Sequence, residues 1–179
     1  MKNRKYELVE DDFILHKGKK LYRIRALKNI SKLVSKGELG GYIEGYHNLS
    51  QEDTCWVFSD AKVYGNARIE NIAGVYGDAE VFGNAVVKDN AKVTGAAKIY
   101  GNVVVKGIAW IGSGADVYGN ASIRSNARVV DYAKIYGNAV IKDDAKVIGY
   151  AEVSENATVG KNAEIHENIK VYGNTVIKG

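Results

Sequence analysis

The sequence predicts an all-β protein in which a parallel β-helix makes up most of the chain. Three observations lead to this prediction. From Asp60 to Gly179 the chain divides into 20 consecutive six-residue repeats without an insertion. The fourth position of the repeat is Val or Ile in all 20 copies, and the second position is Ala in 17 of them. The chain contains 20 Gly and no Pro, which suits a repetitive β structure whose turns use Gly and Asn.

Residues 1–53 precede the repeats and are predicted to form a small β-rich cap. We expect strands at 5–9 and 13–15, a turn at 16–20, a return strand at 21–27, and a short helix or an irregular segment around 30–35. A β-helix has unpaired strand edges at its ends, which is why a cap is needed. The repeats stop at a repeat boundary, so we expect the C-terminal edge to be exposed or covered by another chain.

The repeat predicts which residues form the core. Positions 2 and 4 lie two residues apart and face the same side of a strand, so they point inward, whereas positions 3 and 5 face solvent. Positions 6 and 1 are rich in Gly, Asn and Asp, which tolerate positive φ and turn the chain. Residues 54–59 fit in front as a degenerate first repeat. The predicted β-helix therefore spans 54–179.

This pattern resembles the hexapeptide-repeat superfamily of left-handed parallel β-helices. The resemblance implies the left-handed sense and a triangular coil of three repeats, so 126 residues would give about seven coils. One difference from the family is that Gly often follows the aliphatic residue directly there, whereas here it comes two residues later, as in Val63-Tyr64-Gly65.

Stacking every third repeat gives one face an aromatic ladder beside charges of alternating sign. The alternation supports the three-repeat coil independently of the family, because stacked opposite charges stabilise neighbouring strands. The ladder is either a self-stacking stiffener or a platform for a nucleobase or sugar, with a lysine near its phosphate. The ligand-binding candidates on this face are Tyr100, Tyr118, Tyr136, Lys98 and Lys134.

The next face combines an Asn ladder at its first positions with two outward columns. The valine column is predicted to be a subunit interface, because a column of outward aliphatic side chains forms a patch; its members are Val86, Val104, Val140 and Val176, with Ser122 and Thr158 between them. The basic column is either a solubilising surface or an anion-binding cleft between subunits; its members are Lys88, Lys106, Arg124 and Lys142. The third face is irregular, and Trp110 is its ligand-binding candidate.

The sequence gives little indication of catalysis. Members of the resembled superfamily include acyltransferases with a catalytic His at a subunit interface and loops that hold coenzyme A. Here only His166 lies in the repeats, as a weak catalytic candidate, and no loop interrupts them. Zinc enzymes of that superfamily need three His ligands, so neither a metal site nor a cofactor is expected. Cys55 is expected to be a packed core thiol.

The leader before the repeats, G-G-Y-I-E at 40–44, N-L-S-Q at 48–51 and then Trp56, is similar to that of a group of phage, prophage and bacterial hexapeptide-repeat proteins. That similarity favours a non-catalytic binding protein with a host-interaction or anti-defence role, which sequesters an anionic, nucleotide-like ligand. The alternatives are an acyltransferase-like enzyme with an intersubunit site, and a structural rod or filament component.

We expect a homo-oligomer, either a dimer or a trimer, and a host protein is a further candidate partner. The net charge of +4 permits an anionic partner but is too low to favour nucleic acid. The N-terminal region, which starts with Met1-Lys2-Asn3-Arg4, lacks the apolar stretch of a signal peptide, and no apolar run approaches the ~20 residues of a membrane span. The sequence therefore predicts a cytoplasmic protein without membrane association, in the host cytoplasm if it is phage-encoded.

Overall fold

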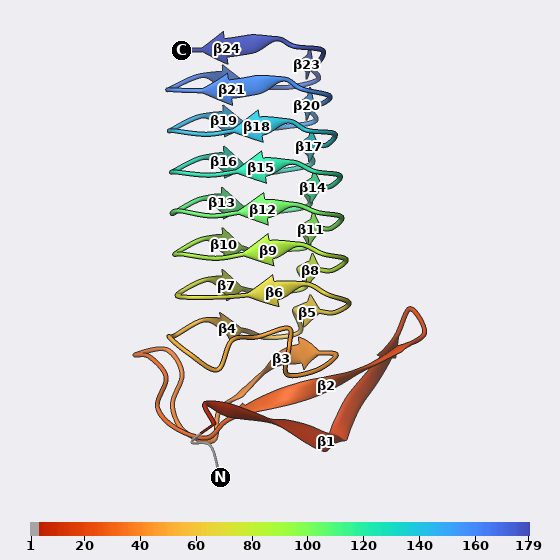
Figure 1. Ribbon diagram of the computed structural model, residues 1–179, viewed down its shortest axis with the longest axis vertical. Coiled ribbons are helices and arrows are strands. Elements are labelled where there is room, and N and C mark those ends of the chain that lie inside the picture. Colours follow the sequence, from red (N-terminus) through yellow and green to blue (C-terminus); the bar gives the residue numbers. More distant parts are fainter. Residues whose placement is uncertain (1–3) are drawn as a thin grey trace.

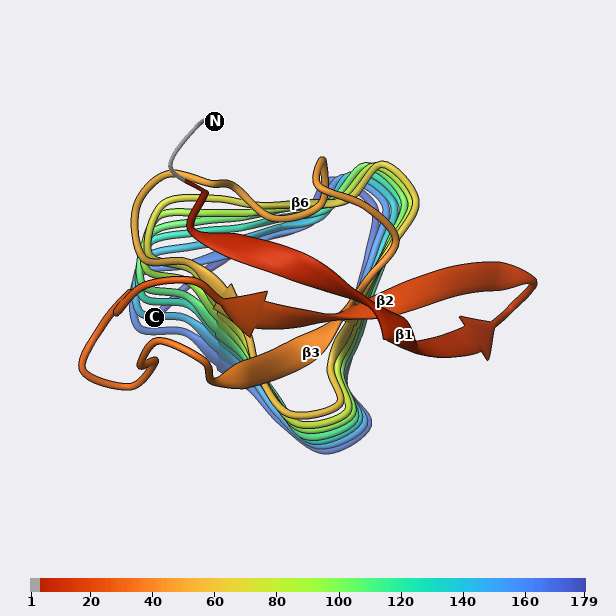
Figure 2. The same cartoon turned by 90° about the horizontal axis from the view of Figure 1, so that it is seen from below.

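A computed structural model describes residues 4–179, which form an all-β rod with a cap at its N-terminal end (Figure 1). The described residues contain strands β1–β24 and no helix. Three sheets run along the rod and form its three sides, as the view along the axis shows (Figure 2). The predicted parallel β-helix is thereby confirmed, while its left-handed sense stays a prediction.

Each side of the rod is one sheet, which we number 1 to 3. Sheet 1 contains β1 (Tyr6–His16), β2 (Lys19–Ala26), β3 (Leu39–Ile43), β5 (Lys62–Val63), β8 (Glu80–Val81), β11 (Lys98–Ile99), β14 (Asp116–Val117), β17 (Lys134–Ile135), β20 (Glu152–Val153) and β23 (Lys170–Val171). Sheet 2 contains β6 (Arg68–Ile69), β9 (Val86–Val87), β12 (Val104–Val105), β15 (Ser122–Ile123), β18 (Val140–Ile141), β21 (Thr158–Gly160) and β24 (Val176–Lys178). Sheet 3 contains β4 (Trp56–Val57), β7 (Gly74–Val75), β10 (Lys92–Val93), β13 (Trp110–Ile111), β16 (Arg128–Val129), β19 (Lys146–Val147) and β22 (Glu164–Ile165).

The strand register confirms that three repeats make one coil. Lys98 pairs in parallel with Glu80 on one side and with Asp116 on the other, 18 residues away in each direction. The core follows the repeat as expected, since every residue at positions 2 and 4 from Ala61 to Ile165 is at most 4% exposed. Alanine at position 2 lets the three sheets approach closely at the corner, and the larger Val or Ile at position 4 fills the interior.

The corners use the conformation predicted for them. The sixth position has a positive φ in every repeat from Gly65 to Gly173. At Gly101, with φ 78°, a Cβ would lie 2.6 Å from the carbonyl oxygen of Gly119 in the next coil. Glycine is therefore required there both for its backbone conformation and for the close approach of stacked corners.

The cap differs from its prediction in three places. The turn expected at 16–20 is only Lys17 and Gly18, because β1 continues to His16 and β2 starts at Lys19. The strands expected at 5–9 and 13–15 are one strand, β1, because the acidic residues between Val9 and Phe13 form a register irregularity in its pairing with β2 and do not break the strand. At 30–35 the irregular alternative holds, with an isolated bridge between Ser31 and Val34. Residues 1–3 of the predicted cap lie outside the described residues.

The rod has about eight coils, one more than predicted. Sheet 1 contains eight strands besides the antiparallel β1 and β2, because β3 pairs in parallel with β5. Leu49 bridges Ile69 and β4 pairs with β7, so residues 39–57 complete a coil ahead of the regular repeats. The division of the chain into units at 53/54 stays a prediction. Between residues 4 and 179, no helix is long and apolar enough to cross a membrane.

Candidate anion-binding site

The outward face of sheet 2 carries the predicted basic and valine columns side by side. Each cation follows the last residue of a two-residue strand, and each valine begins a strand on the same side of the sheet. Successive strands lie about 4.8 Å apart, so the basic column extends over about 14 Å of the rod. Lys88, Lys106, Arg124 and Lys142 are thus held in a line by the coil repeat.

The cations of the basic column form few ion pairs. Among the described residues, Lys88, Lys106 and Arg124 form no ion pair, and the contact of Lys142 is with Asp143 at 4.0 Å. A surface hollow follows the column and is lined by Asp89, Lys106, Gly107, Arg124, Ser125, Lys142 and Asp143. Three cations therefore face one hollow together with two carboxylates.

Those two carboxylates are bound to the backbone of the next coil. Asp89 Oδ2 accepts a hydrogen bond of 2.9 Å from the amide of Gly107, and Asp143 Oδ2 accepts one of 3.0 Å from the amide of Lys161. Each carboxylate thus satisfies a corner amide while its negative charge stays beside the column. The corner residues that follow Lys106 and Arg124 are Gly107 and Ser125, so the two middle repeats contribute no carboxylate of their own.

The charged column of sheet 1 is arranged differently. Lys98 pairs with Asp116, and Asp116 pairs with Lys134, which confirms the alternation of sign along the face. Burial raises the pKa of Asp116, while the two lysines act in the opposite direction. Lys98 and Lys134 thus neighbour a carboxylate in the strand register, without forming an ion pair among the described residues, whereas the cations of sheet 2 neighbour one another.

The aromatic ladder on sheet 1 stacks on itself. Five rings from Tyr64 to Tyr136 have centroid separations of 4.8–5.1 Å and interplanar angles of 1–8°. Both faces of Tyr100 and Tyr118 are covered by neighbouring rings, so a base or sugar would have to stack at the end of the series, on Tyr136. The ladder and the basic column lie on different sides of the rod.

The valine column is only partly accessible. Val86, Val104 and Val140 are half-buried, whereas Val176 is 57% exposed. Beside it, the predicted Asn ladder forms six side-chain hydrogen bonds of 2.9–3.1 Å, each from one Nδ2 to the Oδ1 of the next coil. The face of sheet 2 is therefore held along the rod at one corner while its cations face solvent.

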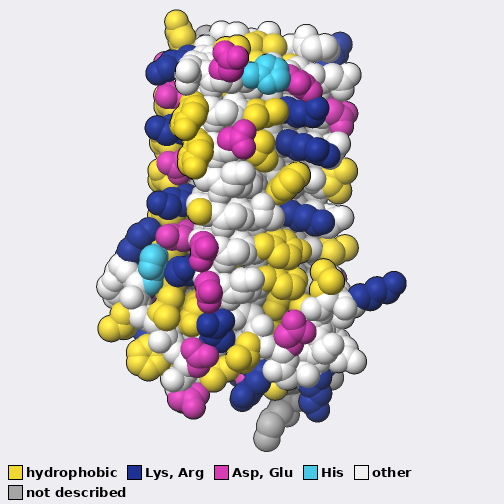
Figure 3. All heavy atoms as spheres, turned by 180° about the vertical axis from the view of Figure 1, so that it is seen from behind, with side chains coloured by type: hydrophobic (Ala, Val, Ile, Leu, Met, Phe, Trp, Pro, Cys, Tyr) yellow, Lys and Arg dark blue, Asp and Glu magenta, His cyan; other side chains and the backbone are white. Residues whose placement is uncertain are grey.

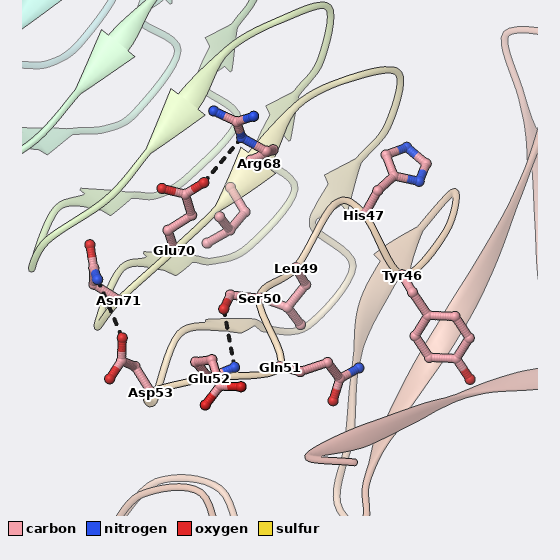
Figure 4. Close-up of a pocket in the computed structure, with 11 residues that line it drawn as sticks. Tyr46, His47, Leu49, Ser50, Gln51, Glu52, Asp53, Arg68, Glu70 and Asn71 are labelled. Atoms are coloured by element: carbon pink, nitrogen blue, oxygen red, sulfur yellow. Dashed lines mark hydrogen bonds and ion pairs between the residues drawn. The ribbon is translucent and has the colours of Figure 1, made fainter. Parts of the chain in front are cut away.

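A second hollow lies on the same side of the rod next to the cap (Figure 4). It is lined by Tyr46, His47, Leu49, Ser50, Gln51, Glu52, Asp53, Arg68, Ile69, Glu70 and Asn71. Arg68 is paired there with Glu70 at 3.0 Å, and Asn71 donates a hydrogen bond to Asp53. Because carboxylates dominate this hollow, it is a poor site for an anion, and the candidate site is the basic column farther along the rod.

The remaining candidates are separate from this site. His166 is half-exposed, with Nε2 3.7 Å from Glu164, and lines neither hollow. Trp110 lies on sheet 3, where its Nε1 donates a 2.9 Å hydrogen bond to Thr94. In residues 4–179, no three His, Cys, Asp or Glu side chains are grouped to hold a metal.

Two polar clusters were not predicted from the sequence. Cys55 is fully buried as expected, but Lys5 is buried with it, with Nζ 3.3 Å from Sγ. At the hairpin tip, His16, Lys17 and Tyr64 place hydrogen-bonding atoms 3.1, 2.8 and 2.8 Å from Oε2 of Glu80. No local pattern indicates either cluster, because each joins the cap to a distant part of the chain.

Comparison with protein-family models gives no match for this chain, and comparison with curated proteins gives none either. The chemistry of the sites is therefore the basis for a functional proposal, together with the repeat and leader patterns.

Proposed function

We propose that this protein is a non-catalytic binding protein that holds an anionic, nucleotide-like ligand along the basic column of sheet 2. The observation that supports this most is the run of four cations on successive coils, three of them without an ion pair among the described residues. The same chain alternates charge sign on sheet 1. The coil repeat thus places unlike charges next to one another on sheet 1, whereas it places like charges next to one another along the basic column of sheet 2.

A run of like charges costs stability in the free protein and favours binding of an anion. Two unit charges about 4.8 Å apart in water repel by about 0.9 kcal/mol before screening by salt. A phosphate or diphosphate group beside Lys106 and Arg124 would replace this repulsion by attraction. Ligands with several charges along their length fit a linear column better than a single compact ion.

The similarity of the leader to phage and prophage proteins supports a biological setting for this proposal. In that setting the protein acts in the host cytoplasm, where it sequesters a nucleotide signal and antagonises a bacterial defence response. A host protein that presents an acidic surface is the alternative partner. Both roles need binding but no chemical step.

We propose further that the valine column is a contact between copies of the chain. It lies beside the basic column, so a homodimer or homotrimer formed through it would place cations from two subunits around one anion. The half-burial of Val86, Val104 and Val140 agrees with a shallow contact of this kind.

The test is calorimetric titration and thermal shift against a panel of cyclic nucleotides and ADP-ribose derivatives. We expect at least one of these compounds to bind saturably, with affinity that falls as salt increases. The double variant Lys106→Gln/Arg124→Gln should weaken that binding at least tenfold, since it removes two cations from the hollow. The matched control Lys98→Gln/Lys134→Gln removes two cations from sheet 1 and should leave affinity unchanged. If no compound binds, or if both variants weaken binding equally, the proposal fails.

A further inference from the structure

A third hollow lies on a different side of the rod, where the cap meets sheet 3. The irregular segment around Ser31–Val34 lies over the first coils of this sheet and leaves a hollow of about 250 Å³. Figure 3 shows this side of the rod, with hydrophobic side chains gathered near the cap and Lys and Arg side chains farther along. The hollow is lined by Ser31, Lys32, Leu33, Thr54, Phe58, Ile72, Ala73, Tyr76, Asn90 and Lys92.

One wall of the hollow is aromatic and is held in place by a glycine. The rings of Phe58 and Tyr76 stack with centroids 4.3 Å apart and planes 6° from parallel. Tyr76 folds back across its own strand, and a Cβ at Gly74 would lie 2.5 Å from its ring. Gly74 is the one glycine among the third positions of the 20 repeats, so this repeat departs from the pattern where the ring needs space. Burial raises the pKa of Tyr76, which keeps the phenol neutral.

The charge of the hollow is positive and uncompensated. Its two charged lining residues are Lys32 and Lys92, and neither forms an ion pair with any residue in 4–179. No carboxylate lines it, whereas the hollow along the basic column contains Asp89 and Asp143. The hydroxyls of Ser31 and Thr54 and the amide of Asn90 add hydrogen-bonding groups for a polar ligand.

We propose that this hollow binds a small organic anion with a planar ring, such as an aromatic carboxylate, sulfonate or phosphate. The ring would pack against Tyr76 and Phe58, where aromatic contacts add to the burial of apolar area. The negative group would lie between Lys32 and Lys92. An inorganic anion leaves the aromatic wall unused, and a neutral ring leaves both lysines unpaired, so a ligand that combines the two features is favoured over either alone.

The site is independent of the basic column because it lies on sheet 3 and shares no residue with the hollow on sheet 2. Binding of an anion at one site can therefore be measured without the other. If one of the two sites does not bind its ligand, the proposal for the other site is unaffected.

The experiment uses a fluorescent probe and its neutral analogue. The probe is 8-anilinonaphthalene-1-sulfonate, and N-phenyl-1-naphthylamine has the same rings without the sulfonate. We expect one saturable site for the sulfonate on the full chain, with the neutral analogue at least tenfold weaker. Lys92→Gln should reduce affinity for the sulfonate about five- to tenfold and leave affinity for the neutral analogue unchanged.

Four further variants complete the test. Gly74→Ala should weaken both probes, because the new Cβ displaces the Tyr76 ring, and if it does not fold then Lys32→Gln serves as the second test of the site. Lys62→Gln on sheet 1 and Lys178→Gln on sheet 2 are matched controls that should leave both affinities unchanged. Equal affinity for the two probes, an absence of saturable binding, or an unchanged sulfonate affinity in Lys92→Gln would overturn the proposal.

Discussion

Removing one cation from the basic column should stabilise the free protein. The change is Lys106→Gln, which removes the charge and keeps a polar side chain that is one atom shorter. Lys106 lies between Lys88 and Arg124 in the register of sheet 2, and none of the three forms an ion pair among residues 4–179. Two repulsive neighbours are therefore relieved by the single change.

The size of the effect follows from the strand spacing. Each neighbouring charge at about 4.8 Å contributes about 0.9 kcal/mol of repulsion in water, which screening reduces to about half at physiological salt. The free energy of unfolding should therefore rise by up to about 1 kcal/mol at 0.15 M salt, since the change also removes an attraction to Asp89 in the same hollow. A larger gain is expected at low salt, and a change of 1 kcal/mol corresponds to about 2–4 °C in Tm for a chain of this size.

The assay is thermal and urea unfolding of both proteins at low, physiological and high salt, without ligand. Lys98→Gln is the matched control, because its neighbours on sheet 1 are Glu80 and Asp116. That variant loses attraction and should be destabilised by up to about 1 kcal/mol. If Lys106→Gln is also destabilised, or if its gain does not shrink as salt rises, the column is not electrostatically frustrated and the reasoning is refuted.

Three further predictions concern the contacts that hold the rod. Burial opposes ionisation of Glu80, but hydrogen bonds from Lys17, Tyr64 and His16 outweigh it and lower its pKa from 4.5 to about 2. Because the pKa of Glu80 is lower in the folded protein than its ordinary value, ionised Glu80 stabilises the fold. This contribution to the free energy of unfolding is complete above about pH 4.5 and is lost as the pH falls to about 2. Glu80→Gln should therefore lower the free energy of unfolding at pH 7 by about 1–2 kcal/mol, and by almost nothing at pH 2, in denaturant titrations at both pH values. Asn102→Ala removes two hydrogen bonds of 2.9 Å from the exposed ladder and should cost about 1 kcal/mol in urea unfolding; an unchanged midpoint would mean that water replaces the ladder. Gly101→Ala should lower the free energy of unfolding by about 2–4 kcal/mol, measured by thermal unfolding. The control Gly18→Ala should lower it by about 1 kcal/mol, because Gly18 has a similar φ but nothing lies within 4 Å of the added Cβ. Equal losses in the two variants would contradict a steric contribution from the stacked corner.

The repeat made most of the fold predictable. A residue at position 4 can be followed through 20 copies, and its uniform Val or Ile identity specifies an inward direction at every strand. The 18-residue register was likewise readable from charge, because Lys98, Asp116 and Lys134 alternate in sign only if three repeats make a coil. The cap has no such redundancy, and there the extent of β1 and the extra coil at 39–57 were missed.

The candidate sites divide in the same way. The basic and valine columns are periodic, so their members could be named from the sequence. The hollow on sheet 3 could not, since it is formed by Lys32 from the cap, Phe58 and Tyr76 from two coils, and Lys92 from a third. The sequence did contain one indication of this hollow, namely Gly74, because it is a third position of the repeat that lacks a side chain.

By itself the sequence determined the parallel β-helix, its core residues, its corners and the chemistry of each outward column, because a repeat expresses the same local energetics many times. Only the tertiary structure decided how the cap meets the rod. It placed the hairpin on Glu80, joined Lys5 to Cys55 in the interior, and set an irregular segment over sheet 3. These contacts join residues of the cap to residues up to 64 positions away, and single long-range contacts leave no periodic pattern in a chain.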